Sequence, residues 1–191
     1  VVGSIPILGS TGHRLDGFFV YLKYVIILLL HIMIKLRGVS KIYSADTVAL
    51  RNLNLHIDAG EFVSIVGQSG TGKTTLIKLL IAEERPTRGK IEIGDWDISH
   101  IGSKEIPYLR RQIGIVFQDF KLLPKKTVYE NTAFALEVAG EHTRRIHTVV
   151  PQVLEIVGLH GKANRYPHQL SGGEQQRVAI ARALVHRPKI I

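Results

Sequence analysis

The spacing of apolar side chains in the first third of the chain predicts strands. Apolar and polar residues alternate over 34–39 and again over 53–57, as they do along a strand with one buried face. Residues 58–61, with the sequence Asp-Ala-Gly-Glu, are typical of a turn. The short apolar run 62–66 then ends at Gly67, which is the pattern of a buried strand.

After this run the periodicity becomes helical. Leu76, Leu79 and Leu80 fall at positions i, i+3 and i+4, while Lys78 lies off that face. The later pattern predicts two more strands and three more helices, over residues 88–94, 112–117, 127–139, 143–157 and 172–186.

Two local signals bear on these helices. Thr127 and Glu130 have the spacing of a capping box, which opens a helix reaching Ala139. Pro151 marks a kink or a boundary within the following helix. The whole pattern, strands first and then strands mixed with helices, indicates an α/β protein.

The ends of the chain suggest its domain organisation. The chain begins at Val1, its one methionine is Met33, and the strand pattern starts directly afterwards. We expect residues 1–32 to be an upstream extension and residues 33–191 to form the domain. The apolar stretch 18–34 has an alternative interpretation as a membrane or interfacial anchor, although it contains Lys23 and is shorter than the ~20 residues of a spanning helix.

Charge and cysteine content narrow the setting. The formal charge of +9 suits either an anionic partner, such as nucleic acid or a membrane surface, or a solvated basic face. The basic residues are scattered rather than clustered, which favours the solvated face, and we expect no nucleic-acid partner. The chain has no cysteine, so disulfides and thiolate metal sites are excluded, and a cytoplasmic setting fits.

Residues 67–74, GQSGTGKT, form a phosphate-binding loop between the expected strand and helix. Glycines allow the backbone N–H groups to turn inward toward phosphate oxygens, and the positive end of the following helix faces the same anion. Lys73 places a charge near the β and γ phosphates, and the Thr74 hydroxyl suits Mg²⁺. The candidate ATP-binding residues are Gly67, Gln68, Ser69, Gly70, Thr71, Gly72, Lys73, Thr74 and Thr75.

A second phosphate-facing helix start lies about a hundred residues later. The segment LSGGEQQRVAIARAL begins at Leu170, and its Ser-Gly-Gly would open a long helix. Together with the phosphate-binding loop, this segment closely resembles the signature of ATP-binding cassette (ABC) ATPases. The resemblance implies a P-loop NTPase fold of ABC type with an antiparallel β subdomain and an inserted helical subdomain. It also assigns Ser171, Gly172, Gly173 and Glu174 to the ATP of a second copy.

The same resemblance gives roles to two other residues. Tyr43 stands where ABC domains place an aromatic ring against adenine, although a tyrosine at the core edge is the simpler alternative. Gln118, after the strand expected at 112–117, occupies the position of the Q-loop, which would sense Mg²⁺ and the attacking water. The catalytic residues of the family, the Walker B aspartate and the following glutamate, would come after Ile191. The core sheet is therefore expected to be C-terminally incomplete, with no catalytic residue in this chain.

Several segments are most similar to the FtsE family of cell-division ATP-binding proteins. They include GEFVSIVGQSGTGKTTLIKLL, PYLRRQIGIVFQDFKLL and KTVYENTAFALEVAG. The likeness implies ATP and Mg²⁺, a homodimer that sandwiches ATP, and an FtsX-like integral membrane partner at the cytoplasmic face of a bacterial membrane, where the pair would signal to cell-wall hydrolases. ATPases that export lipoproteins or macrolides are an alternative, and soluble ABC ATPases acting on DNA or ribosomes are a more distant one.

The resemblance also suggests where the membrane partner would bind. Phe120, Leu122 and Leu123 are apolar residues in a loop beside three lysines, as a docking site for a short helix requires. The alternative is that these side chains pack beneath the helical subdomain.

Overall fold

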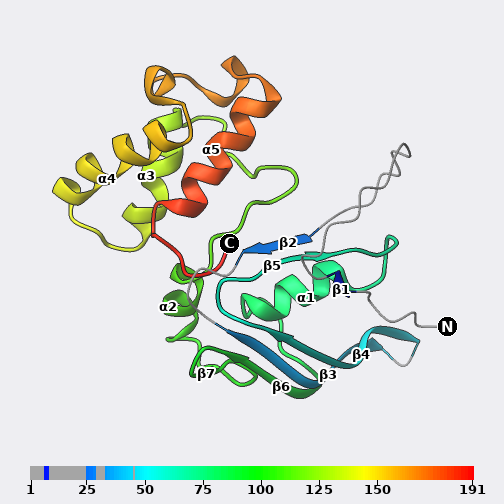
Figure 1. Ribbon diagram of the computed structural model, residues 1–191. Coiled ribbons are helices and arrows are strands. Elements are labelled where there is room, and N and C mark those ends of the chain that lie inside the picture. The colour runs from blue at the N-terminus through cyan, green and yellow to red at the C-terminus, as the bar shows by residue number, and fades with distance from the viewer. Residues whose placement is uncertain (1–6, 9–24, 29–32, 45) are drawn as a thin grey trace. The chain divides into compact units, whose positions relative to one another are not determined.

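The computed structural model describes residues 7–8, 25–28, 33–44 and 46–191, and Figure 1 shows their elements. The chain divides into two compact units. The first comprises Val1–Arg110 with Ile190, and the second comprises Arg111–Lys189 with Ile191.

A four-stranded antiparallel sheet in the first unit has the order β4-β3-β6-β7 (Figure 1). Ile34 pairs with Ile57 on one side and with Ile93 on the other, and all three side chains are buried. The alternation of apolar residues therefore does mark one buried face of this sheet, as predicted. The strands are β3 (Ile34–Ser44), β4 (Thr47–Ile57), β6 (Arg88–Ile93) and β7 (Trp96–Asp97).

The strand that leads into the phosphate-binding loop belongs to a second sheet. This strand, β5 (Phe62–Ile65), lies between β1 (Ile7–Leu8) and β2 (Val25–Leu28), and both pairings are antiparallel. The sequence did not lead us to expect these partners, because residues 25–28 read only as part of an apolar stretch. Most of the possible anchor at 18–34 lies outside the described residues.

Helix α1 (Lys73–Leu80) follows the loop, and its face of Leu76, Leu79 and Leu80 is buried as expected. The short helix α2 (Ile106–Arg111), which has Pro107 in its first turn, was not predicted. Proline is tolerated in the first turn of a helix, where its missing N–H has no partner to lose. Among the described residues, no helix has both the length and the hydropathy needed to cross a bilayer.

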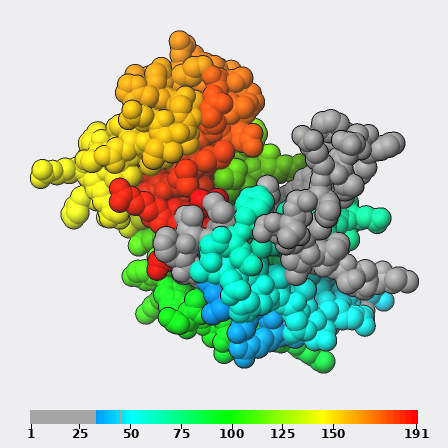
Figure 2. Space-filling view, in the orientation of Figure 1, coloured from blue at the N-terminus to red at the C-terminus, as the bar shows by residue number. Residues whose placement is uncertain are grey.

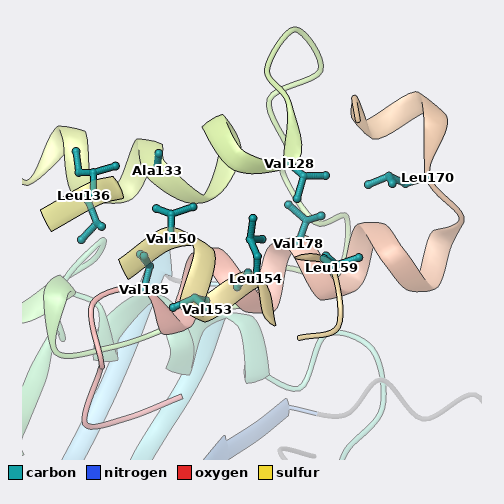
Figure 3. Close-up of a cluster of buried hydrophobic side chains, with 12 residues drawn as sticks. Val128, Ala133, Leu136, Val150, Val153, Leu154, Leu159, Leu170, Val178 and Val185 are labelled. Atoms are coloured by element: carbon teal, nitrogen blue, oxygen red, sulfur yellow. The ribbon is translucent and has the colours of Figure 1, made fainter. Parts of the chain in front are cut away.

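The second unit contains the helices α3 (Val128–Val138), α4 (Thr143–Ile156) and α5 (Gly172–Leu184), with 3₁₀ turns at His160–Lys162 and Pro167–Gln169. Their apolar faces meet in one buried cluster, which Figure 3 shows. The helix α4 continues through Pro151 to Ile156, and its outer face is exposed, as the yellow atoms of Figure 2 show. The cluster consists of Val128, Ala133, Leu136, Ile146, Val150, Val153, Leu154, Leu159, Leu170, Val178, Ala181 and Val185.

The strand expected over 112–117 is not present. Only Ile113 makes a bridge, and residues 114–117 are irregular. A strand requires a neighbour that supplies hydrogen bonds along its length. Within the second unit, the described neighbour is Lys189, whose N–H donates to the carbonyl of Gln112 at 2.9 Å.

Candidate nucleotide-binding site

The phosphate-binding loop turns sharply between β5 and α1. Gly70 and Gly72 have φ values of +84° and +86°, which are open to glycine and disfavoured for other residues. The Thr71 N–H and hydroxyl both donate to the Gln68 carbonyl, at 3.4 and 2.8 Å. The loop is therefore curled and internally bonded, as a phosphate cradle requires.

Gly72 caps the N-terminus of α1 and lies against β4. A Cβ atom at this position would stand 2.4 Å from the Ala49 carbonyl oxygen, so a side chain does not fit. The helix has no acidic residue in its first turn and, within the described structure, no side chain that caps it. Its first N–H groups and its positive dipole are therefore available to an anion.

The Lys73 ammonium is held inside the curl of the loop. It donates to the carbonyls of Gly67 and Gln68, the latter at 2.6 Å, and to the Thr71 hydroxyl at 3.2 Å. The residue is only 8% exposed. The loop thus fixes a positive charge where phosphate oxygens would lie, while the neighbouring Thr74 is exposed at the start of the helix.

Tyr43, at the end of β3, lies beside the helix that follows the loop. Its hydroxyl is 3.5 Å from the Thr75 hydroxyl, and its ring is half exposed. The Lys41 ammonium lies 5.1 Å from the ring centroid and 3.2 Å from the Glu84 carboxylate. The structure therefore brings Tyr43 and Thr75, two of the predicted site residues, together and leaves the Tyr43 ring half exposed.

Glu84 was not anticipated from the sequence, because it belongs to no motif. Its pKa lies below the ordinary value, because the Tyr43 hydroxyl and the ammonium groups of Lys41 and Lys78 stabilise the carboxylate. Lys78 lies 3.3 Å from the same carboxyl group. The acid therefore stays ionised, and its contact with Lys41 keeps that lysine beside Tyr43.

In the second unit, Ser171 caps the N-terminus of α5. Its hydroxyl accepts from the Glu174 N–H, and the Glu174 carboxylate accepts from the Ser171 N–H at 2.9 Å. Ser171, Gly172 and Gly173 are exposed, and a Cβ atom at Gly172 would meet nothing within 4 Å. This helix start is therefore both preorganised and accessible.

Glu174 plays a different part from the three residues before it. Besides closing the capping box, it pairs with Lys162, and these contacts lower its pKa from 4.5 to about 2. An ionised carboxylate at this position would repel phosphate rather than bind it. Glu174 thus shapes the helix start, which leaves Ser171 exposed.

Gln118 is exposed in the turn that follows the irregular segment 114–117. Phe117, directly before it, is 41% exposed, whereas Leu122 packs against the helical cluster. Leu122 therefore follows the alternative given above for the apolar loop residues, which is that they pack beneath the helical subdomain. The structure places Gln118 and the signature in the second unit, and Tyr43 and the phosphate-binding loop in the first.

The sequence profile of the ABC transporter family matches residues 50–191. The chain belongs to the ABC transporter family. The matched range includes both the phosphate-binding loop and the N-terminus of α5, and the activity of the family is ATP hydrolysis.

Named relatives within the ABC family are cell-division ATP-binding proteins. The chain is 54% identical over 160 residues to FtsE of Mycobacterium tuberculosis, covering 83% of this chain and 70% of that protein. It is 53% identical to FtsE of Bacillus subtilis over 159 residues, with the same coverage. FtsE of Escherichia coli is 46% identical over 159 residues, which cover 83% of this chain and 72% of the relative. The chain is therefore FtsE-like along most of its length.

Solved ABC structures agree with this fold. An ATP-binding cassette determined as a dimer in a post-hydrolysis state, bound to ADP and Pi, matches with a TM-score of 0.68 and 33% identity. The match covers 81% of this chain and 70% of that one. The predicted P-loop fold of ABC type is thus confirmed.

Proposed function

We propose that this chain is the ATP-binding subunit of an FtsE-type complex that acts in cell division. Its ATP cycle would signal through an integral membrane protein like FtsX to cell-wall hydrolases. The observation that carries the proposal is the 46–54% identity to FtsE proteins of three different bacteria. The two preorganised helix starts, at α1 and α5, supply the matching chemistry.

ATP binds with its phosphates in the loop from Gly67 to Thr75. The loop N–H groups and the α1 N-terminus surround the phosphates, and the Lys73 ammonium moves its hydrogen bonds from the loop carbonyls to phosphate oxygens. Adenine stacks on Tyr43, which is exposed enough to receive it. Glu84 supports this arrangement by keeping Lys41 against the same tyrosine.

Mg²⁺ accompanies the nucleotide. The exposed Thr74 hydroxyl at the first turn of α1 suits this ion, which takes few protein ligands and binds mainly phosphate oxygens and water. Gln118 is the proposed second contact, since a side-chain amide oxygen is also a suitable ligand. When bound, Mg²⁺ would neutralise charge that develops on the phosphates during hydrolysis.

Two copies of the chain form the working unit. The dimer bound to ADP and Pi among the structural relatives supports this assembly. In our proposal, Ser171, Gly172 and Gly173 of one copy face the ATP held by the loop of the other. ATP would close the pair, and hydrolysis would reopen it.

The loop 117–126 is the proposed docking site for the membrane partner, which would keep the chain at the cytoplasmic face of the membrane. Phe117 is exposed and Phe120 is partly exposed, and Lys121, Lys125 and Lys126 border them. Apolar side chains rimmed by charge suit a short amphipathic helix of the partner.

Replacing both phenylalanines tests this proposal. In the full-length protein, Phe117→Asp with Phe120→Asp should leave ATP binding intact and reduce co-purification with the membrane partner at least tenfold. The backbone of Phe120 has φ +55°, which aspartate tolerates, so the fold should survive.

Val138→Asp is the matched control, because Val138 is 70% exposed on α3 of the same unit. A folded double variant, verified by circular dichroism, that co-purified like the control would refute this docking site. Loss of folding would show instead that the two side chains are needed for packing.

A further inference from the structure

We infer that Arg182 is a positioning residue that ties the conformation of the docking loop 117–126 to the signature helix α5. The inference rests on the proposed function, because it gives the signature a route to the loop that meets the membrane partner. The signature residues, Arg182 and the loop all belong to the second unit.

The contact is a two-pronged hydrogen bond to consecutive peptide groups. Arg182 Nη1 donates to the Lys121 carbonyl and Nη2 donates to the Phe120 carbonyl, each at 2.6 Å. The planar fork of arginine can meet two neighbouring acceptors at once, which the single ammonium of lysine cannot reproduce. Burial lowers the pKa of Arg182, in line with a guanidinium withdrawn from water.

The two peptide groups that Arg182 holds are in an unusual conformation. Phe120 and Lys121 have φ values of +55° and +46°, in the left-handed region that residues with a Cβ atom disfavour. Such a conformation persists only where surrounding contacts enforce it. Arg182 supplies such contacts from α5, in addition to the bond within the loop from the Phe120 N–H to the Phe117 carbonyl at 3.0 Å.

A second anchor holds the other half of the loop independently. Asn131 of α3 is fully buried, and its side chain bonds both the N–H and the carbonyl of Leu123, at 2.8 and 3.1 Å. The later part of the loop is thus fixed to α3, while Arg182 fixes the earlier part to α5. A relative shift of α5 and α3 would therefore change the loop between Phe120 and Leu123.

The segment that enters the loop also touches α5. A Cβ atom at Gly114 would stand 2.8 Å from the carbonyl oxygen of Ala183, the residue after Arg182. This close approach leaves little room for α5 to move independently of the chain that leads to Gln118.

Helix α5 provides the mechanical link. Arg182 lies eleven residues after Ser171, roughly 16 Å along a helix of 1.5 Å rise per residue. Because α5 is continuous from Gly172 to Leu184, we expect a shift that nucleotide causes at Ser171 to reach the carbonyls of Phe120 and Lys121 through Arg182. The same side chain thereby couples nucleotide state to the exposure of Phe117 and Phe120.

Hydrogen–deuterium exchange of the full-length protein, with and without ATPγS and Mg²⁺, tests the link. Two peptides are followed: 170–178, which reports the signature, and 117–126, which reports the loop. In the wild-type protein, nucleotide should slow exchange at the signature and change it at the loop. In Arg182→Gln the signature should still respond, whereas the loop should exchange about tenfold faster and ignore nucleotide, because two charge-assisted hydrogen bonds are lost.

Arg144→Gln is the control, because it removes the same charge from the exposed face of α4. If Arg182→Gln does not fold, Arg182→Lys keeps the charge and the aliphatic stem and is expected to lose the loop response in the same way. A loop that still responds like the control in the folded variant would overturn the inference. A wild-type signature peptide that ignores nucleotide would instead overturn the proposed function, and the inference with it.

Discussion

At the scale of single residues, the phosphate-binding loop depends on positions where backbone geometry excludes a side chain. Gly72 combines a φ of +86° with contact against β4. Gly60, in the turn before β5, has the same φ of +86°, but a methyl group there would meet no other atom within 4 Å. Substituting each glycine therefore distinguishes two destabilising effects: the left-handed backbone conformation, which both share, and the steric clash with β4, which only Gly72 has.

Alanine substitution at these two glycines should give different losses of stability. Gly60→Ala should lower the free energy of unfolding by about 1 kcal/mol, the cost of a left-handed alanine. Gly72→Ala should lower it by roughly 3 kcal/mol or more, since its methyl group would also overlap the Ala49 carbonyl. Urea unfolding of both variants measures the difference, and equal losses would show that β4 does not press on the loop.

At the scale of elements, the start of α5 is held by charge as well as by its cap. Glu174 accepts from the Ser171 N–H and pairs with Lys162, so its pKa in the folded protein is about 2, compared with 4.5 ordinarily. A carboxyl group whose pKa falls on folding stabilises the fold above its unfolded pKa. That stabilisation is lost as the pH falls from about 4.5 toward 2.

Glu174→Gln should therefore be less stable than the wild type at pH 6, and the difference should shrink as the pH falls toward 3. Glutamine can still cap the helix, so the change isolates the charge. Urea titrations across this range provide the measurement, with Glu155→Gln on the exposed face of α4 as the control. A difference that did not vary with pH would mean that the ion pair with Lys162 does not stabilise the fold.

Elements with local signals were predicted well from the sequence, and elements that depend on distant partners were not. The capping box at Thr127 and the Ser-Gly-Gly sequence at Ser171 placed the starts of α3 and α5 correctly, because the capping bonds span three residues. The strand expected at 112–117 was wrong, because a strand is defined by a neighbour that the local pattern does not contain. The two partners of β5 were missed for the same reason.

The same division applies to the candidate site. Motifs identified Lys73 and Ser171, whose roles depend on backbone close in sequence. Glu84 and Arg182 contact residues that are 41 and 61 to 62 positions away. Arg182 lies within the signature segment, but the segment's pattern does not identify the loop residues that it contacts. Their roles became visible only from the contacts.

At the scale of the whole molecule, the nucleotide-binding parts are divided between two units. The phosphate-binding loop and Tyr43 belong to the first, and the signature and Gln118 belong to the second. Cutting the chain at the proposed boundary, residue 33, would also remove β1 and β2, which pair with β5. These strands carry no phosphate-binding residue, so we expect residues 1–32 to affect stability rather than ATP binding.

The central claim is that each ATP is bound by the loop of one copy and the signature of another. Two substitutions test it: Lys73→Ala, which removes the charge in the loop, and Gly173→Asp, which places a carboxylate against phosphate. Gly173 has room for a side chain, and an acidic residue in the first turn suits the helix, so the second variant should fold.

Mixed dimers of the full-length protein, purified through two different tags, give the decisive measurement of ATP hydrolysis. With Lys73→Ala in one copy and Gly173→Asp in the other, both defects fall in the same shared site. The other shared site stays intact, so ATP hydrolysis should be about half that of the wild type. With both substitutions in one copy and none in the other, each shared site has one defect, and hydrolysis should be lost. The reverse result, with activity retained only when both substitutions lie in one copy, would contradict the account, because it would mean that each chain completes its own site.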